Sequence, residues 1–98
     1  MIIKARKIPV EIECVQFTDK ESAEYIEGWS NGQVRYCVSK WQKYLIIKTL
    51  EGNLEARVND YIVKGVHGEF YAVKPDIFRK TYEVIRDEKR NDDILLDE

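Results

Sequence analysis

Basic and aromatic side chains lie among one another in the last third of the chain, where they could bind a small molecule. Cationic groups hold phosphates, and aromatic faces stack on nucleotide bases. A hairpin that folds back on the turn after it would bring several of these side chains together. The candidate ligand-binding residues are Lys64, His67, Tyr71, Lys74 and Arg79. The simpler alternative places the lysines on an outward strand face and leaves the tyrosine hydroxyls in water.

The sequence lacks the usual signatures of catalysis and metal binding. His67 is the single histidine, and in a glycine-flanked turn it would be a loop residue that tolerates an unusual φ. Cys14 and Cys37 form no Cys-x-x-Cys pair, so we expect two reduced thiols on strands facing the core. Glu11 and Glu13 share one face of a predicted strand, which a solvated surface explains better than a metal site. We therefore expect no catalytic residue, no metal, no cofactor and no enzymatic activity.

Two tryptophans and an acidic segment are candidates for contact with another protein. Trp29 and Trp41 flank a predicted strand, in or near loops, and loop tryptophans can anchor interfaces. The alternative is that each indole covers the core. Residues 19–27 hold four acidic residues against one lysine, and Glu24 and Glu27 are the candidates for an interface on that segment. Such an acidic surface could compete for a site that normally binds nucleic acid.

The charge of the chain is weak and uneven. The 98 residues carry a net charge of −2, and residues 87–98 contribute −4 through six acidic and two basic side chains, which leaves +2 on the rest. Direct nucleic-acid binding, which favours a basic stripe, is not expected. No apolar run approaches the roughly 20 residues of a membrane span, and no secretory signal is apparent. We therefore expect a cytoplasmic protein that does not bind membranes.

Alternating apolar residues predict six or seven short strands. We expect them over residues 8–17, 33–38, 44–49, 54–58, 61–66, 69–73 and, as a closing strand, 82–85. Val34, Tyr36 and Val38 are expected to point inward. Gly52 would supply a positive φ in one hairpin, and a tight turn at His67 and Gly68 would form the last hairpin.

One helix is expected after the first strand. Thr18 followed three residues later by Glu21 is a capping-box signature, and Gly28 is typical of the position just past a helix C-terminus. A helix of two or three turns is marginal in isolation, so it must pack on a sheet.

These elements predict an α+β fold, namely a curved, partly closed antiparallel sheet of six to seven short strands with one helix after the first strand. Pro75 fits the start of a single helical turn over residues 76–80. Residues 1–86 would form a single domain, and residues 87–98 would form a frayed acidic tail.

Several segments, in this order, resemble the pattern of a family of small phage and prophage accessory proteins. They are RKIPV over residues 6–10, QFT over 16–18, IIKTLEG over 46–52, NDYIVKGVHGEFY over 59–71, KPDIF over 74–78 and KTYE over 80–83. Asn59 stands where the family has glycine, and asparagine tolerates the left-handed φ of such a turn. Ala72 and Val73 replace a small residue and a cysteine, so no thiol function is carried over.

The resemblance implies an accessory protein made from a phage genome inside a bacterial host cell, in a family without an established activity. Three hypotheses follow. The protein could inhibit a host defence complex, or another host protein complex, by direct protein contact. It could instead be a sponge that sequesters a small nucleotide signalling molecule, in a pocket that a homodimer could share. It could also be an accessory protein without an inhibitory role.

Overall fold

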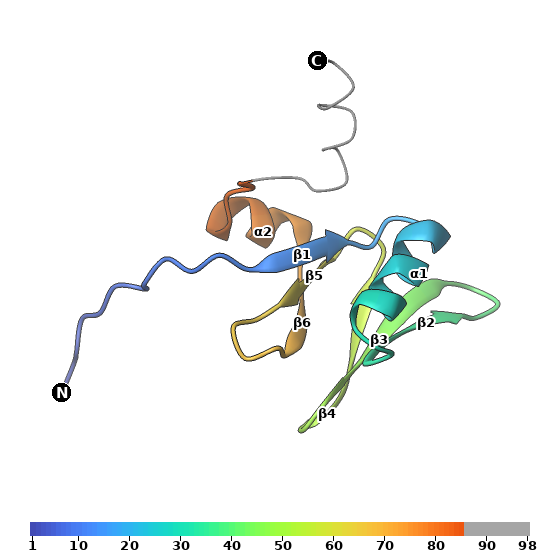
Figure 1. The fold of residues 1–98 in the computed structure, drawn as a ribbon, viewed down its shortest axis with the longest axis horizontal. Helices are drawn as coiled ribbons and strands as arrows, with labels where there is room; N and C mark the ends of the chain where they lie inside the picture. The colour runs from blue at the N-terminus through green and yellow to red at the C-terminus, as the bar shows by residue number, and fades with distance from the viewer. Residues whose placement is uncertain (86–98) are drawn as a thin grey trace, which may run out of the picture.

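The computed structural model describes residues 1–85, which form an α+β fold of six strands and two helices (Figure 1). The elements are β1 (Glu13–Gln16), α1 (Lys20–Trp29), β2 (Val34–Val38), β3 (Lys43–Thr49), β4 (Gly52–Arg57), β5 (Tyr61–Lys64), β6 (Phe70–Val73) and α2 (Pro75–Thr81). The acidic tail predicted over residues 87–98 lies outside the described residues.

The strands form two antiparallel sheets of three strands each, so the prediction of one curved, partly closed sheet is wrong. Sheet 1 has the order β1-β5-β6, and sheet 2 is the meander β2-β3-β4. The chain leaves sheet 2 through a turn at Asn59, whose φ is 83, and β5 then pairs with β1 rather than with β4. The asparagine therefore adopts the left-handed conformation that we expected in place of glycine.

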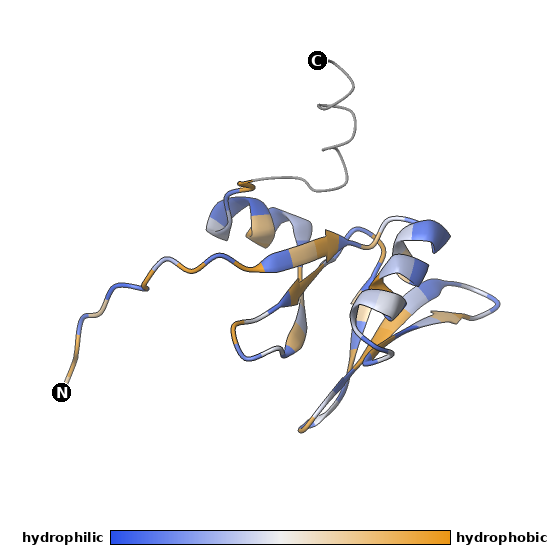
Figure 2. Ribbon diagram, viewed as in Figure 1, coloured by the Kyte–Doolittle hydropathy of each residue, from blue (hydrophilic) through white to orange (hydrophobic). Residues whose placement is uncertain are grey.

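The core lies between α1 and the inner faces of the two sheets. Its largest buried side chains are Phe17, Ile26, Val34, Leu45, Ile47 and Ile62. The hairpin predicted around Gly52 is present as β3 and β4, with Leu45 opposite Ala56 and Ile47 opposite Leu54. Figure 2 shows the hydrophobic residues concentrated in the strands, while α1 carries many hydrophilic residues on its surface.

Helix α1 is capped one residue later than predicted and ends beyond Gly28. The Asp19 carboxylate accepts from the backbone N–H of Ser22 at 2.8 Å, and the Ser22 hydroxyl accepts from the N–H of Asp19 at 2.9 Å. Gly28 lies inside the helix, and the residues with positive φ that follow it are Asn31 and Gly32. The serine hydroxyl thus plays the part that the sequence pattern assigned to Glu21.

Two further predictions about strands are wrong, and a third, for Val38, holds for its direction but not for its burial. The first strand begins at Glu13 and not at residue 8, because its partner β5 ends opposite it at Lys64. Val38 points to the inner side of sheet 2 but beyond the core, so it is 63% exposed. Residues 82–85 form no strand, and the Tyr82 ring instead stacks on Phe78 of α2 at 4.9 Å between centroids.

Helix α2 covers the second face of sheet 1. Pro75 lies at the start of the helix as predicted, but the helix runs for seven residues rather than one turn. Phe78 is buried and stacks on Tyr61 of β5, with ring centroids 3.8 Å apart and planes at 5°. Sheet 1 therefore has two covered faces, which we call the core face (toward α1) and the α2 face.

Candidate functional site

The five predicted ligand-binding residues do not converge. Within sheet 1, Tyr71 lies opposite Val63 on the α2 face, whereas Lys64 lies opposite Phe70 on the core face. A single small-molecule pocket therefore cannot contain both Lys64 and Tyr71 on one side of the sheet. Arg79 is exposed on the last turn of α2, where a cation stabilises the negative end of the helix dipole.

Lys74 forms an ion pair with Asp60 that links parts of the fold, so its ammonium group is already engaged. Its Nζ lies 3.0 Å and 3.2 Å from the two carboxylate oxygens of Asp60, whose side chain is only 3% exposed. The same carboxylate accepts from the backbone N–H of Arg57 at 2.9 Å, and the Asp60 carbonyl accepts from the N–H of Phe17. Asp60 thus joins the end of β4 to β1 and β6.

His67 lies in the turn between β5 and β6, exposed to solvent. Its backbone N–H donates to the Glu69 carboxylate at 2.9 Å. The positive φ of the turn belongs to Gly68, at 80°, so the expectation of an unusual φ at His67 is wrong. The Glu69 carboxylate folds over Gly65 so closely that a Cβ at that glycine would collide with it.

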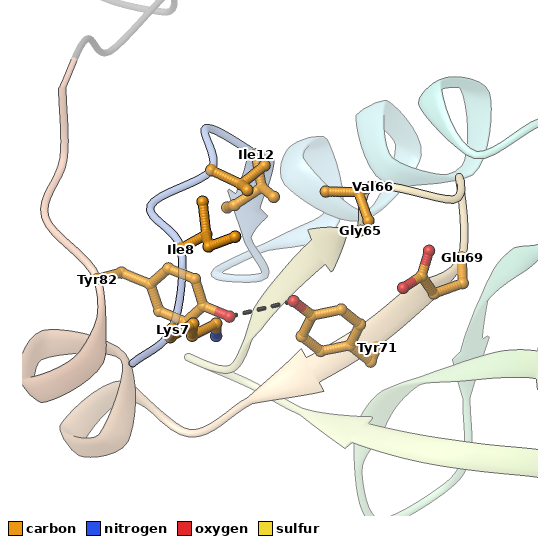
Figure 3. Close-up of a pocket in the computed structure, with 9 residues that line it drawn as sticks. Lys7, Ile8, Ile12, Gly65, Val66, Glu69, Tyr71 and Tyr82 are labelled. Atoms are coloured by element: carbon orange, nitrogen blue, oxygen red, sulfur yellow. Dashed lines mark hydrogen bonds between the residues drawn. The ribbon is translucent and has the colours of Figure 1, made fainter. Parts of the chain in front are cut away.

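A cavity of about 230 Å³ lies on the α2 face, between the N-terminal segment and the β5–β6 hairpin (Figure 3). Its walls are mainly aliphatic, and its polar groups come from one lysine, one glutamate and two tyrosines. The lining residues are Lys7, Ile8, Val10, Ile12, Gly65, Val66, Glu69, Tyr71 and Tyr82. Of the predicted ligand-binding residues, only Tyr71 contributes to it.

The polar end of this cavity is a pair of tyrosine hydroxyls. Tyr71 and Tyr82 are 3.1 Å apart at their hydroxyl oxygens (Figure 3). Burial raises the pKa of the Tyr71 phenol to about 12, and the hydrogen bond with Tyr82 and the negative charge of Glu69 act in the same direction. The Tyr71 phenol therefore stays neutral at physiological pH and offers a hydroxyl group to a ligand rather than a charge.

Two of the four predicted interface residues serve the fold instead. The Trp29 ring packs edge-on against Phe70 with centroids 5.2 Å apart, and its indole N–H donates to Glu13 at 3.3 Å. The Glu27 carboxylate accepts from the backbone N–H of Tyr36 at 2.8 Å, which fixes α1 to β2. Glu24 is exposed on α1, so it remains available for contact.

The fourth predicted interface residue, Trp41, has a very different environment. It lies in the turn between β2 and β3 and is 85% exposed, and Val38 beside the turn is 63% exposed. The Lys40 ammonium lies 5.3 Å from the ring centroid. We call residues 38–42 the Trp41 loop.

The Trp41 loop is held in one conformation by its own hydrogen bonds. The Ser39 hydroxyl accepts from the N–H groups of Trp41 and Gln42 at 3.3 and 3.1 Å, and the Ser39 N–H donates to the Gln42 carbonyl at 2.8 Å. Arg57 of β4 donates to the Gln42 side chain at 2.6 Å. The loop therefore presents a large apolar ring on an ordered backbone. This order could not be predicted from the sequence, because a single serine such as Ser39 does not indicate which hydrogen bonds its hydroxyl will form.

The two cysteines lie on different sheets in the part of the chain that the structure describes. Cys37 lies opposite Tyr44 on the outer face of sheet 2, and Cys14 lies opposite Val63 on the α2 face, so the expectation that both face the core is wrong. Within residues 1–85, no cluster of three potential metal ligands occurs. No helix in this part of the chain is both long and apolar enough to cross a bilayer. No protein-family model, curated protein or solved structure matches the chain.

Proposed function

We propose that this chain is a small phage-encoded binding protein that inhibits a bacterial host complex, foremost a defence complex, by direct protein–protein contact through the Trp41 loop. The observation that carries the proposal is an 85% exposed tryptophan on a hydrogen-bonded turn. Tryptophan is enriched among the residues that dominate binding energy, and an ordered loop loses little entropy when it docks. Exposing such a ring to water has no benefit for folding.

The geometry gives less support to a nucleotide sponge. The cavity of about 230 Å³ is smaller than the roughly 300–1,000 Å³ typical of ligand pockets. Lys74 is engaged by Asp60, and Lys64 lies on the opposite face of the sheet from Tyr71. The cavity therefore offers one lysine, Lys7, and one carboxylate, Glu69, which is a poor set of partners for several phosphates.

The origin in a phage and the action in the host cytoplasm rest on the resemblance of the segments around residues 59–71 and 74–78 to small phage accessory proteins. A small protein of that origin, with no recognised enzyme motif in its sequence, acts most simply by binding. Glu24, exposed on α1, would supply a charged contact outside the tryptophan anchor.

The test compares the wild-type protein with Trp41→Ala and with the matched control Tyr25→Ala, which removes a 62% exposed aromatic ring on α1. Each tagged protein is expressed in bacteria with an active defence system, and phage plating and co-purified proteins are measured. We expect Trp41→Ala to abolish the protection of phage and to weaken binding of the captured protein by about 30-fold or more, as for an interface anchor.

The control should retain both properties, and all three proteins should unfold at similar urea concentrations. Equal effects of the two substitutions would refute the Trp41 loop as the anchor. Native mass spectrometry distinguishes the alternatives. A retained mass of a few hundred daltons would favour the sponge, and a bare protein with no effect on phage plating would favour an accessory role.

A further inference from the structure

The first twelve residues form an extended arm that lines the cavity on the α2 face but pairs with no strand in the described part of the chain. The arm continues from β1 and its N-terminal end runs away from the body (Figure 1). Hydrophobic residues recur at every second position from Ile8 to Ile12, and Figure 2 shows both hydrophobic and hydrophilic residues along the arm. Residues 1–11 are exposed, including Ile8 at 78% and Val10 at 57%. None of residues 1–12 hydrogen-bonds to another described residue. The sequence nevertheless reads as a strand over residues 8–17, so the arm is a strand without a neighbour.

The hydrogen-bonding direction of β1 shows which backbone groups face its free edge. Phe17 donates to Asp60 and accepts from Asn59, so its peptide groups point toward β5. Peptide groups alternate along an antiparallel strand, so the even-numbered residues present theirs at the other edge. Continued into the arm, this alternation aims the N–H groups of Ile8, Val10 and Ile12 outward. Pro9 lacks an N–H, but at this odd-numbered position the N–H would face away from the free edge. The proline therefore removes no hydrogen bond from that edge.

We propose that two copies of this chain pair antiparallel along this edge over residues 7–13. Sheet 1 has β1 at its edge, so the pairing joins two three-stranded sheets into one antiparallel sheet of six, in the order β6-β5-β1-β1-β5-β6. The contact is isologous, because the same segment of each copy faces itself across a two-fold axis.

The sequence of the arm is complementary to itself in one register. Even-numbered residues must face even-numbered ones, and a two-fold axis at Val10 sets Ile8 opposite Ile12 of the second copy. The same register sets Lys7 opposite Glu13, twice per dimer, and moves the Lys7 side chain from the cavity to the core face of sheet 1, where Glu13 lies. Aliphatic and opposite-charge pairs across neighbouring strands are both stabilising. The adjacent register would instead place Pro9 opposite Pro9.

The pairing also explains the open side of the cavity. Ile8, Val10 and Ile12 of one arm form part of its wall on the α2 face. In the dimer, Ile8 of the second copy lies beside Ile12, which covers aliphatic surface that a single copy leaves in water. This inference does not depend on the Trp41 loop, which belongs to sheet 2.

The first test is sedimentation of the full-length chain over a range of concentrations. We expect a species near twice the chain mass of 11.6 kDa. Val10→Pro removes an N–H that faces the edge, and we expect it to weaken dimerisation by about tenfold or more. Glu11→Pro is the matched control, because it removes an N–H on the opposite side of the arm. A monomer at every concentration, or equal effects of the two prolines, would overturn the proposal.

The second test exchanges charges. Lys7→Glu and Glu13→Lys should each weaken the dimer, because each places like charges opposite one another. An equimolar mixture of the two variants should form a heterodimer, detected by native mass spectrometry, since both contacts then join opposite charges. Glu13 also accepts from Trp29, so the fold of Glu13→Lys is checked by circular dichroism. Folded variants that fail to form the heterodimer would refute this register.

Discussion

Asp60 should contribute more to folding than Lys74, although the two side chains form one ion pair. The Asp60 side chain is 3% exposed, and its carboxylate accepts from the Arg57 backbone N–H as well as from Lys74. The Lys74 side chain is 56% exposed, so water can solvate its ammonium group if the carboxylate is removed. The pair is therefore asymmetric, and the two truncations should have different costs.

The expected magnitudes follow from these two environments. Asp60→Ala leaves the N–H of Arg57 without its acceptor and removes a hydrogen bond to a charged group, at a cost of about 2–4 kcal/mol. Lys74→Met keeps the aliphatic stem but removes the counter-ion of a buried carboxylate, which should cost about 1–2 kcal/mol because the lysine half of the pair is exposed. The remaining Asp60 carboxylate still accepts from Arg57. Asp60→Asn preserves an oxygen acceptor and should lie between the two.

Urea unfolding of the three variants and of the double variant Asp60→Ala/Lys74→Met measures these costs. We expect similar m-values and a coupling energy between the two sites of about 1 kcal/mol or less. A Lys74→Met variant as unstable as Asp60→Ala would refute the argument, since the ion pair rather than the backbone contact would then dominate. A stable Lys74→Met protein that loses a bound small molecule would instead restore Lys74 as a ligand-binding residue.

Two further predictions concern local conformation and pH. Gly28→Ala should stabilise the protein by about 0.5–1 kcal/mol, because Gly28 is helical with open space at its Cβ, whereas Gly52→Ala should destabilise it by about 1–2 kcal/mol, because the φ of Gly52 is 119°. Urea unfolding tests both, and equal signs would contradict the reasoning. The raised pKa of Tyr71 means that the folded state favours the neutral phenol, so this stabilisation is complete below pH 10 and declines as the pH rises toward 12. Tyr71→Phe should therefore lose less stability than the wild type over that range, and parallel pH profiles would exclude a role for Tyr71.

Local signals in the sequence predicted most of the elements, because turns depend on a few neighbouring residues. Gly52, Asn59 and Pro75 have the conformations that their types favour. The helix cap was misplaced by one residue because both Asp19 and Thr18 are good capping residues. The division into two sheets could not be predicted locally, since β1 and β5 are distant in the sequence and their pairing is decided by the packed core.

Which of the predicted interface residues are exposed depends on the burial of each side chain, and the sequence alone does not determine that burial. Trp29 and Trp41 occupy similar positions next to a strand, yet one packs on Phe70 and the other is exposed. The difference arises because α1 extends through Gly28 and carries Trp29 onto sheet 1. The β2–β3 turn projects beyond the core, where nothing in the described chain can cover Trp41.

The failure of the predicted ligand pocket comes from a slip of one residue in a single hairpin. A two-residue turn at His67 and Gly68 would set Lys64 directly opposite Tyr71, on the same face of the sheet. The observed register pairs Lys64 with Phe70, so the loop has three residues and Gly68 takes the left-handed position that such loops favour. Because side chains alternate along a strand, this shift moves Lys64 to the opposite face from Tyr71. Burial of Phe70 in the core favours the longer loop, since the shorter one would turn that ring toward α2.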